Sequence, residues 1–576
     1  MSRIHAALAL AGMLSAAGAA DSHEPPAAMR SAHAAMAGMA MGPSPAIYAG
    51  QPDKPGAPLF KGLGRHRHPI STRNPKAQAY FDQGVALLFG FNHAEAIRSF
   101  REAARLDPKC AMCWWGVAFA LGPNINLPMQ ADAMGPAWTA LAKAQGLAPT
   151  TTVRERAWIK ALAARYAKVP PADRHALDEA FAAAMGRLWR AYPSDLDAGV
   201  FYAEAMMDTQ PWDLWASDGV TPKGHAAEIV KVLEGVIKRD PSHPGALHLY
   251  IHAVEGSTTP ERAEAAADRL ATLMPGAGHI VHMPAHIYYR VGRYADAARV
   301  NELAARADED YIAACRAQGY YPAAYYGHNI HFLWTASEME GRYGAALDAA
   351  RRLIKAVDPI PLAARTPQAE LFVFTPVVTQ LRFGKWDEVL AEPMPPAALI
   401  LDQAVFLYAR GVALANKGRL EAAGQVRDAL ASLVASADFS RYERSGMPAE
   451  AMAKLGLELL DGEIARAGGD PSAAVAHFRA AADIEAKLPY TEPPWWHQPV
   501  SHVLGAALLE AKQPAEAEGV YRESLKVYRD DGWALFGLAQ ALEAQGKTEE
   551  AAKVRARFEK AWGQADVKLA SSRQPA

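Results

Sequence analysis

Seven histidines stand in three short stretches of the chain at spacings of three or four residues: His248 and His252; His279, His282 and His286; His328 and His331. Residues three or four apart on a helix share one face, so each stretch directs its imidazoles the same way. Three such helices side by side would form a pocket of neutral nitrogen donors, which favours a transition metal ion. We expect copper first, then zinc or iron.

The number of donors exceeds what one ion needs. A mononuclear site takes three or four ligands, so seven histidines and Glu255 predict either two ions or one ion with outer histidines that hydrogen-bond to carboxylates. Glu255 is a candidate ligand or proton acceptor, and Tyr289, on the same predicted face, is a second candidate catalytic residue. His248 and His252 do not form an H-E-x-x-H motif, because Leu249 occupies the glutamate position.

Pro284 lies between His282 and His286, where a proline interrupts helical hydrogen bonding. Either a helix begins near Met283 and leaves His279 and His282 in its entry turn, or a kink opens the site. Both arrangements allow the histidines to converge.

The chain has three cysteines. Cys110 and Cys113 follow Asp107-Pro108 at a predicted helix start, where the helix dipole lowers a thiol pKa. They could form a redox disulfide or a thiolate ligand pair, or pack as small residues between helices. Cys315 could be a ligand, a reactive thiol or a buried free cysteine.

Two further segments could reach the histidines. His66 and His68 lie in a loop-like stretch that could fold over the groove as an arm. The insert Pro211-Trp212-Asp213-Leu214-Trp215 could cover one rim of it.

The beginning of the chain is typical of export. Arg3, the apolar stretch from Ala6 to Ala17 and the small residues Ala17-Gly18-Ala19 predict a signal peptide over 1–20, although an uncleaved anchor or an Ala-rich cytosolic start is the alternative. Residues 21–60 are rich in Ala, Pro, Met and His and predict a flexible linker. We expect a periplasmic or secreted protein. The net charge of -2 argues against a nucleic-acid partner, and we expect no membrane span after the leader.

A repeat begins near residue 75. Gly84, Ala96, Phe100 and Asp107-Pro108 follow one another at spacings that return, near every 34 residues, around Gly292-Arg293-Tyr294, Gly341-Arg342-Tyr343 and Gly384-Lys385-Trp386. The series resembles the tetratricopeptide repeat over most of 75–565. It implies an all-α superhelical solenoid of about nine to ten helical hairpins. We expect N-terminal repeats over 61–245, His-rich central repeats over 246–356, C-terminal repeats over 357–565 and a tail over 566–576.

Longer strings extend the resemblance to one family of exported bacterial tetratricopeptide-repeat proteins: GRHRHPIST (64–72), HLYIHAVE (248–255), HMPAHIYYRVGRY (282–294) and YYGHNIHFLW (325–334). The repeat places the histidines on the concave face. Two functions follow as hypotheses. The first is an exported metalloprotein, either an oxidoreductase, a hydrolase or a metal-handling protein. The second is a scaffold that binds a peptide or protein partner in the concave groove without metal.

Overall fold

The computed structural model describes residues 57–129, 131–169, 171, 173–315, 317, 321–363 and 366–575. The predicted signal peptide and most of the predicted linker, with His23 and His33, lie outside these residues. Within the described residues, helices form almost the entire structure and the only named strands are two short ones near the C-terminus.

The first half of the chain is a succession of helices in which each packs against the next. The N-terminal helices are α3 (Pro75–Phe89), α4 (His93–Leu106), α5 (Ala111–Ala120), α6 (Met134–Leu147), α7 (Val153–Leu162), α8 (His175–Ala191), α9 (Leu196–Thr209) and α10 (Ala226–Arg239). The central helices are α11 (Pro244–Val254), α12 (Glu264–Leu273), α13 (Gly278–His282), α14 (Pro284–Arg290), α15 (Tyr294–Cys315), α16 (Gly327–Met339) and α17 (Tyr343–Val357). A π-helical turn (Pro322–Tyr326) precedes α16.

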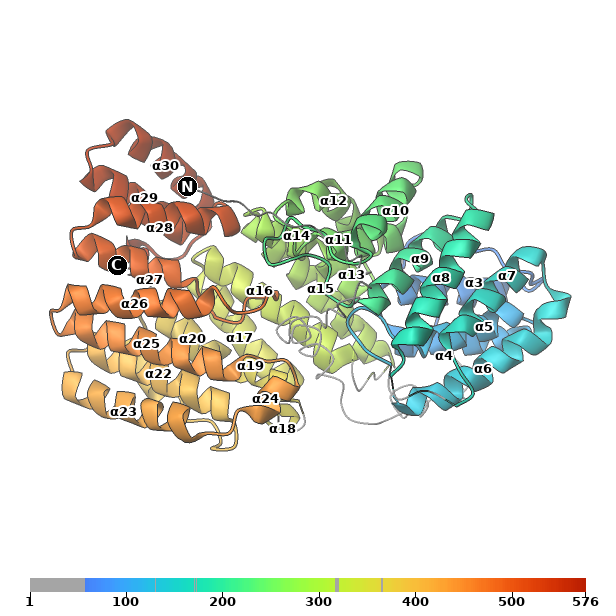
Figure 1. Ribbon diagram of the computed structural model, residues 1–576, viewed down its shortest axis with the longest axis horizontal. Helices are drawn as coiled ribbons and strands as arrows, with labels where there is room; N and C mark the ends of the chain where they lie inside the picture. The colour runs from blue at the N-terminus through green and yellow to red at the C-terminus, as the bar shows by residue number, and fades with distance from the viewer. Residues whose placement is uncertain are drawn as a thin grey trace, which may run out of the picture.

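The second half begins with short helices and continues as regular hairpins. Its helices are α18 (Pro359–Ala363), α19 (Glu370–Val373), α20 (Thr375–Arg382), α21 (Trp386–Ala391), α22 (Ile400–Asn416), α23 (Leu420–Ser436), α24 (Ser440–Arg444), α25 (Ala449–Ala467), α26 (Pro471–Glu485), α27 (Val500–Glu510), α28 (Pro514–Val527), α29 (Gly532–Ala544) and α30 (Thr548–Ala561). Strands β1 (Leu569–Ser571) and β2 (Gln574–Pro575) pair antiparallel. Figure 1 shows the N-terminal helices at one end, α11–α15 in the middle and the C-terminal hairpins at the other end.

Glycines and aromatic rings set the distance between hairpins. A Cβ on Gly84 of α3 or on Gly116 of α5 would lie 2.4 or 2.5 Å from the ring of Phe100 on α4. The Phe100 ring therefore fills the space between two consecutive first helices, which can approach only because both carry glycine there. Gly505 and Gly537 hold Tyr521 in the same way. This is the packing expected from the repeat, and the predicted all-α solenoid is confirmed.

Left-handed residues mark the turns within hairpins. Gly292, Gly341, Gly384 and Gly418 have φ between 68° and 82° at this position. Glycine adopts this conformation without the steric cost that a side chain carries. Phe91 stands at the corresponding turn between α3 and α4 with φ 54°, which places a bulky residue where other hairpins have glycine.

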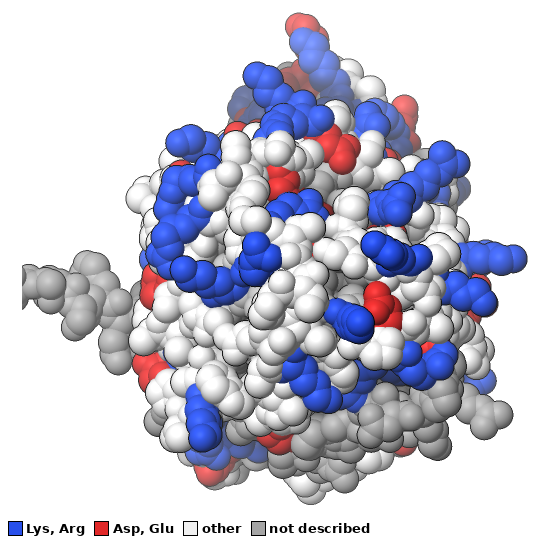
Figure 2. All heavy atoms as spheres, turned by 90° about the vertical axis from the view of Figure 1, so that its right-hand side faces the viewer, with Lys and Arg blue, Asp and Glu red and all other residues white. Residues whose placement is uncertain are grey.

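Surface charge is uneven along the molecule. Figure 2 shows that Lys and Arg outnumber Asp and Glu on the end of the molecule formed by the N-terminal helices. The near-neutral net charge of the whole chain therefore conceals a basic N-terminal end. Among the described residues, no helix is both long and apolar enough to cross a membrane.

Candidate metal centre

Six of the seven predicted histidines come together in two groups of three. His248, His252 and His279 form the first group, and His282, His286 and His328 form the second. In each group, one possible ligand atom per residue lies within 4.8 Å of the others. All six side chains are buried. The helical spacing therefore predicts the clustering of these six histidines. Metal binding by the clusters is part of the proposed function.

Pro284 leaves the histidine face intact. Helix α13 ends at His282 and α14 begins at Pro284, and Met283 between them keeps right-handed helical dihedrals (φ −49°, ψ −38°). The proline therefore occupies the first turn of α14, where its missing N–H costs little. The rings of His282 and His286 remain 4.8 Å apart across this junction. The structure combines parts of both predicted arrangements: a helix begins at Pro284, but His279 and His282 lie in the preceding helix α13, and the imidazoles stay together across the junction.

In the first group, two of the three rings have one nitrogen hydrogen-bonded to an acceptor. His248 Nδ1 lies 2.5 Å from the carbonyl oxygen of Phe89, and His252 Nδ1 lies 2.8 Å from Glu255 Oε1. A carbonyl and a carboxylate only accept, so each Nδ1 carries the hydrogen and each Nε2 keeps its lone pair. Both Nε2 atoms, and both ring nitrogens of His279, are buried without a hydrogen-bond partner among the described residues. Buried imidazole nitrogens that lack partners and converge are the pattern of metal ligands held by outer hydrogen bonds.

His282 of the second group is oriented in the same way. Asn301 donates from Nδ2 to the carbonyl oxygen of Ala297, which turns its Oδ1 toward His282 Nδ1 at 2.6 Å. His282 therefore keeps the lone pair on Nε2, which lies 2.9 Å from His286 Nε2. The ring of His328 lies 4.7 Å from that of His282 and 5.6 Å from that of His286.

The two groups are adjacent. The ring centroids of His279 and His282 are 5.7 Å apart, and those of His252 and His286 are 6.0 Å apart. Burial lowers the pKa of His248, His279, His282 and His328 well below the ordinary value, so these rings are neutral at pH 7 and can donate lone pairs.

Two carboxylates lie on the outer side of the groups, and one of them, Glu255, connects the two. Glu255 Oε2 lies 2.5 Å from His286 Nδ1, so Glu255 joins His252 of the first group to His286 of the second. Glu492 Oε2 lies 3.1 Å from the same His286 Nδ1. Burial acts to lower the pKa of His286, but the two carboxylates raise it to about 10. His286 therefore carries two protons and donates from Nε2 to His282; an ion held by this group would replace that second proton.

The carboxylate of Glu255 contacts the Nδ1 atoms of two histidines and therefore acts on these histidines rather than as a ligand beside their Nε2 atoms. Burial acts to raise its pKa, but His286 and His252 lower it to about 2, so it is ionised. Glu255 thus orients two imidazoles, rather than facing the space between the Nε2 atoms. A third possible ligand group, Glu255, His286 and Glu492, uses the outer side of His286.

The loop before α27 brings Glu492 to the centre from far along the chain. Tyr490 donates from its hydroxyl to the carbonyl oxygen of Glu255 at 3.3 Å. Arg290 lies over the Tyr490 ring at 5.4 Å and 3.9 Å from Glu492 Oε1, and it donates to the carbonyl oxygen of Ser257 at 3.0 Å. Glu492 escapes prediction from the sequence, because it lies more than 200 residues from its partners and belongs to no motif.

Two aromatic residues in left-handed conformations border the histidines. The Phe91 ring lies 4.6 Å from that of His248 and 5.5 Å from that of His279. Trp212, with φ 61°, packs edge-on against His252 at 5.1 Å. Left-handed backbone is costly for bulky residues and persists where the surrounding structure requires it, often at functional sites. The insert around Trp212 covers this side of the cluster, in agreement with its predicted position.

Other predicted residues lie apart from the two groups. The ring of His331 stacks on Trp334 at 5.1 Å and packs against Phe372 at 5.2 Å, so it belongs to neither group of three. Tyr289 packs against Tyr294 and Phe332, and no ring contact with a histidine is present for it among the described residues.

The cysteines are also separate from the histidines. Cys110 and Cys113 form a disulfide at the start of α5, which leaves no thiolate at either residue. Burial and the nearby Glu95 raise the pKa of Cys315 to about 11, so this thiol is protonated at neutral pH and is a poor nucleophile or ligand.

The arm that carries His66 and His68 folds onto the solenoid but reaches a different carboxylate. His68 Nδ1 lies 2.6 Å from Asp197 Oδ2, while His66 Nε2 and His243 Nε2 each lie 3.0 Å from Asp197 Oδ1. His243 Nδ1 also accepts from the N–H of Ala246, which requires the hydrogen on Nε2. His68 and His243 thus hydrogen-bond to Asp197 and His66 pairs with it, and this cluster fastens the arm to α9 and to the N-cap of α11.

Two segments of the chain match models of the tetratricopeptide repeat, over 77–110 and 508–557. The human IFIT1 dimer with m7Gppp-AAAA is 13% identical, over 85% of this chain and 91% of that one, with a TM-score of 0.29. Yeast Tom70 is 12% identical, over 86% and 93%, also with a TM-score of 0.29. The P58(IPK) TPR domain is 13% identical, over 82% and 99%, with a TM-score of 0.19. No curated protein sequence matches the chain. The helical hairpins and the two repeat matches make the chain a tetratricopeptide-type α-solenoid.

Proposed function

We propose that the protein is an exported metalloprotein that holds two transition metal ions, one in each group of three histidines. The observation that carries the proposal is the convergence of buried ring nitrogens from six histidines. In four of these rings, those of His248, His252, His282 and His286, the opposite nitrogen lies at an acceptor. Six imidazoles without a thiolate or thioether suit copper, zinc or iron, and copper is our first choice.

Three protein ligands for each ion leave coordination positions open, which is typical of catalytic rather than structural sites. A bound copper or iron ion would supply redox chemistry, and zinc would supply Lewis acid chemistry. Of these we propose an oxidoreductase first, a metal-dependent hydrolase second and metal storage third. In each case the residues of the chain orient the ligands, through Phe89, Asn301, Glu255 and Glu492, and exclude water from the site with Phe91 and Trp212.

Export is part of the proposal. It is supported by the leader-like residues 1–20 and by the Cys110–Cys113 disulfide, which suits an oxidising compartment.

Elemental analysis of the full chain without a histidine tag tests the metal centre. We expect two equivalents of metal in the wild type, loss of one in His248→Ala/His252→Ala and loss of the other in His282→Ala/His286→Ala. His175→Ala, which changes an exposed histidine on α8, is the matched control and retains both. Absence of metal from a folded wild-type protein, after growth and dialysis with copper, zinc or iron, would refute the proposal.

The second candidate function is a scaffold that binds a peptide or protein partner, which tetratricopeptide repeats support in general. A specific observation favours it for the C-terminal repeats: a short β-hairpin of the chain itself, β1 and β2, already packs against them.

A further inference from the structure

The segment that follows α30 turns back and lies across the concave side of the C-terminal hairpins. Asp566 accepts hydrogen bonds from the backbone N–H groups of Tyr343 and Gly344, at 2.7 and 2.8 Å, at the start of α17. Leu569 of β1 then packs with Phe383 and Trp533. The tail of the chain is therefore anchored at both its beginning and its middle.

Ser572 is the first of two side chains that enter the groove. It is 1% exposed, its hydroxyl lies 2.7 Å from that of Tyr521, and it donates to the carbonyl oxygen of His502 at 2.7 Å. Tyr521 is the ring that fills the space between Gly505 and Gly537, so a rigid part of the repeat contacts this serine.

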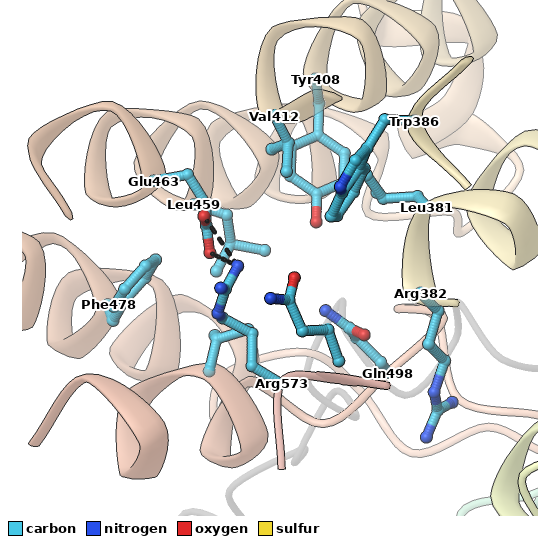
Figure 3. A pocket seen from close by; sticks show the side chains of 12 residues that line it. Leu381, Arg382, Trp386, Tyr408, Val412, Leu459, Glu463, Phe478, Gln498 and Arg573 are labelled. Atoms are coloured by element: carbon cyan, nitrogen blue, oxygen red, sulfur yellow. Dashed lines mark hydrogen bonds and ion pairs between the residues drawn. The ribbon is translucent and has the colours of Figure 1, made fainter. Parts of the chain in front are cut away.

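Arg573 is the second. Its Nη1 lies 3.2 and 3.1 Å from the two carboxylate oxygens of Glu463 on α25, and 3.3 Å from Asn416 Oδ1 on α22. Figure 3 shows the Arg573 side chain reaching into the groove toward Glu463. Burial acts to raise the pKa of Glu463, but Arg573 and Arg466 lower it, so the pair is ionised. A buried guanidinium needs such a partner, because an unpaired buried charge is costly.

Little free space remains beside Arg573. The cavity that remains beside Arg573 has a volume of about 20 Å³, close to the space that one water molecule needs. The first helices of successive hairpins supply much of its wall, with Leu381, Tyr408, Leu459 and Val503, and Trp386 and Phe478 add to it from second helices. These are the surfaces on which a solenoid of this kind presents a ligand site.

We propose that residues 566–575 are an intramolecular ligand, and that this groove binds peptides that present a small hydroxyl residue followed by arginine at the tip of a tight β-turn, as Ser572 and Arg573 do between β1 and β2. A partner with this pair of side chains displaces the tail and makes the same contacts with Tyr521, His502 and Glu463. The inference is independent of the metal centre, since no hydrogen bond, ion pair or ring contact joins Tyr521, His502 or Glu463 to the six clustered histidines within the part of the chain that the structure describes.

The test uses the full chain and a fluorescent peptide of residues 566–576, DVKLASSRQPA, with fluorescence polarisation as the readout. Arg573→Glu places a negative charge against Glu463 and releases the tail, so this variant is expected to bind the peptide at least tenfold more tightly than the wild type. Lys568→Glu is the matched control, because it makes the same charge change at an exposed position of the same segment and should bind like the wild type. Adding Glu463→Gln to Arg573→Glu should abolish binding, as should exchanging arginine for glutamate in the peptide.

Equal binding of the peptide to the wild type and to folded Arg573→Glu, or binding to neither, would overturn the inference. A protease site inserted after the exposed Gly563 provides a second measurement that leaves the groove unaltered. After cleavage, the tail should exchange with the labelled peptide; a cleaved protein that stays folded, loses its tail and takes up no peptide would also overturn it.

Discussion

Replacing the carboxylates behind the histidines should weaken metal binding without removing any ligand. In Glu255→Gln the amide oxygen can accept from only one of the two imidazoles that Glu255 now holds, His252 at 2.8 Å and His286 at 2.5 Å. The other imidazole faces an NH₂ group and is pushed toward the tautomer that carries its hydrogen on Nε2, where it cannot bind a metal.

The structure also predicts the size of the effect. His286 has a second acceptor in Glu492 at 3.1 Å, so the single change Glu255→Gln is partly compensated. Losing an outer hydrogen bond to a metal ligand lowers metal affinity about 10- to 100-fold, or about 1.4 to 2.7 kcal/mol. We expect about tenfold for Glu255→Gln, little change for Glu492→Gln, and about 100-fold for the double variant, with the extra loss confined to the ion of the second group. The two changes are therefore non-additive.

Competition with a chelator of known affinity, for Cu²⁺ and Zn²⁺ separately, measures these losses. Glu264→Gln is the matched control, because Glu264 pairs with Arg293 at the surface of the neighbouring helix. A double variant that keeps its helical circular dichroism and binds both ions as tightly as the wild type would refute this account of the centre.

Three further outcomes follow from the structure. His331→Ala should leave the metal content unchanged and His328→Ala should remove one equivalent, as measured by elemental analysis; loss of metal in the former would place His331 in the centre after all. Phe91→Gly should destabilise the protein in urea unfolding, because losing a buried ring costs about 3–5 kcal/mol and relieving the left-handed backbone returns only about 1–2 kcal/mol. Lys512→Gly, at an exposed turn with φ 61°, should instead stabilise the protein by about 1 kcal/mol. Burial and then Glu370 raise the pKa of Asp402, whose carboxylate oxygens lack hydrogen-bond partners among the described residues. The unfolded chain therefore releases this proton at a lower pH than the folded protein does, and the folded state loses stability as pH rises. Asp402→Asn should raise the melting temperature above that of the wild type more at pH 8 than at pH 5, and an equal gain at both values would contradict this.

Much of the architecture was predictable because its determinants are local. The repeat of small and aromatic residues specifies hairpins, and Phe100 packs between Gly84 and Gly116 as that pattern requires. The convergence of six histidines follows from the same periodicity, since a spacing of three or four residues survives even the break at Pro284.

Local spacing does not decide which histidine of a pair reaches the centre. His328 and His331 share a helix face, yet His331 stacks on Trp334 of its own helix and meets Phe372 of α19 edge-on. The position of the His331 ring is set by these two aromatic residues, and the position of Phe372 depends on the tertiary packing of α19. Glu492 is a stronger case, because its place beside His286 depends on how the entire solenoid curves between them.

Phe91 differs from Glu492, because its unusual position at a repeat turn can be recognised in the sequence. It stands at a turn where Gly292, Gly341 and Gly384 satisfy a left-handed backbone, and a phenylalanine there costs about 1–2 kcal/mol. In a repeat protein such a departure from glycine requires a compensating contact, and the Phe91 ring makes this contact with His248 and His279. Lys512 also replaces glycine at a left-handed turn, but its side chain is exposed to solvent. A non-glycine residue at such a turn therefore indicates a site only when that residue is also apolar and large. Turn positions that exchange glycine for an aromatic residue are therefore places to look for a site in a solenoid, even when the ligands themselves lie on other repeats.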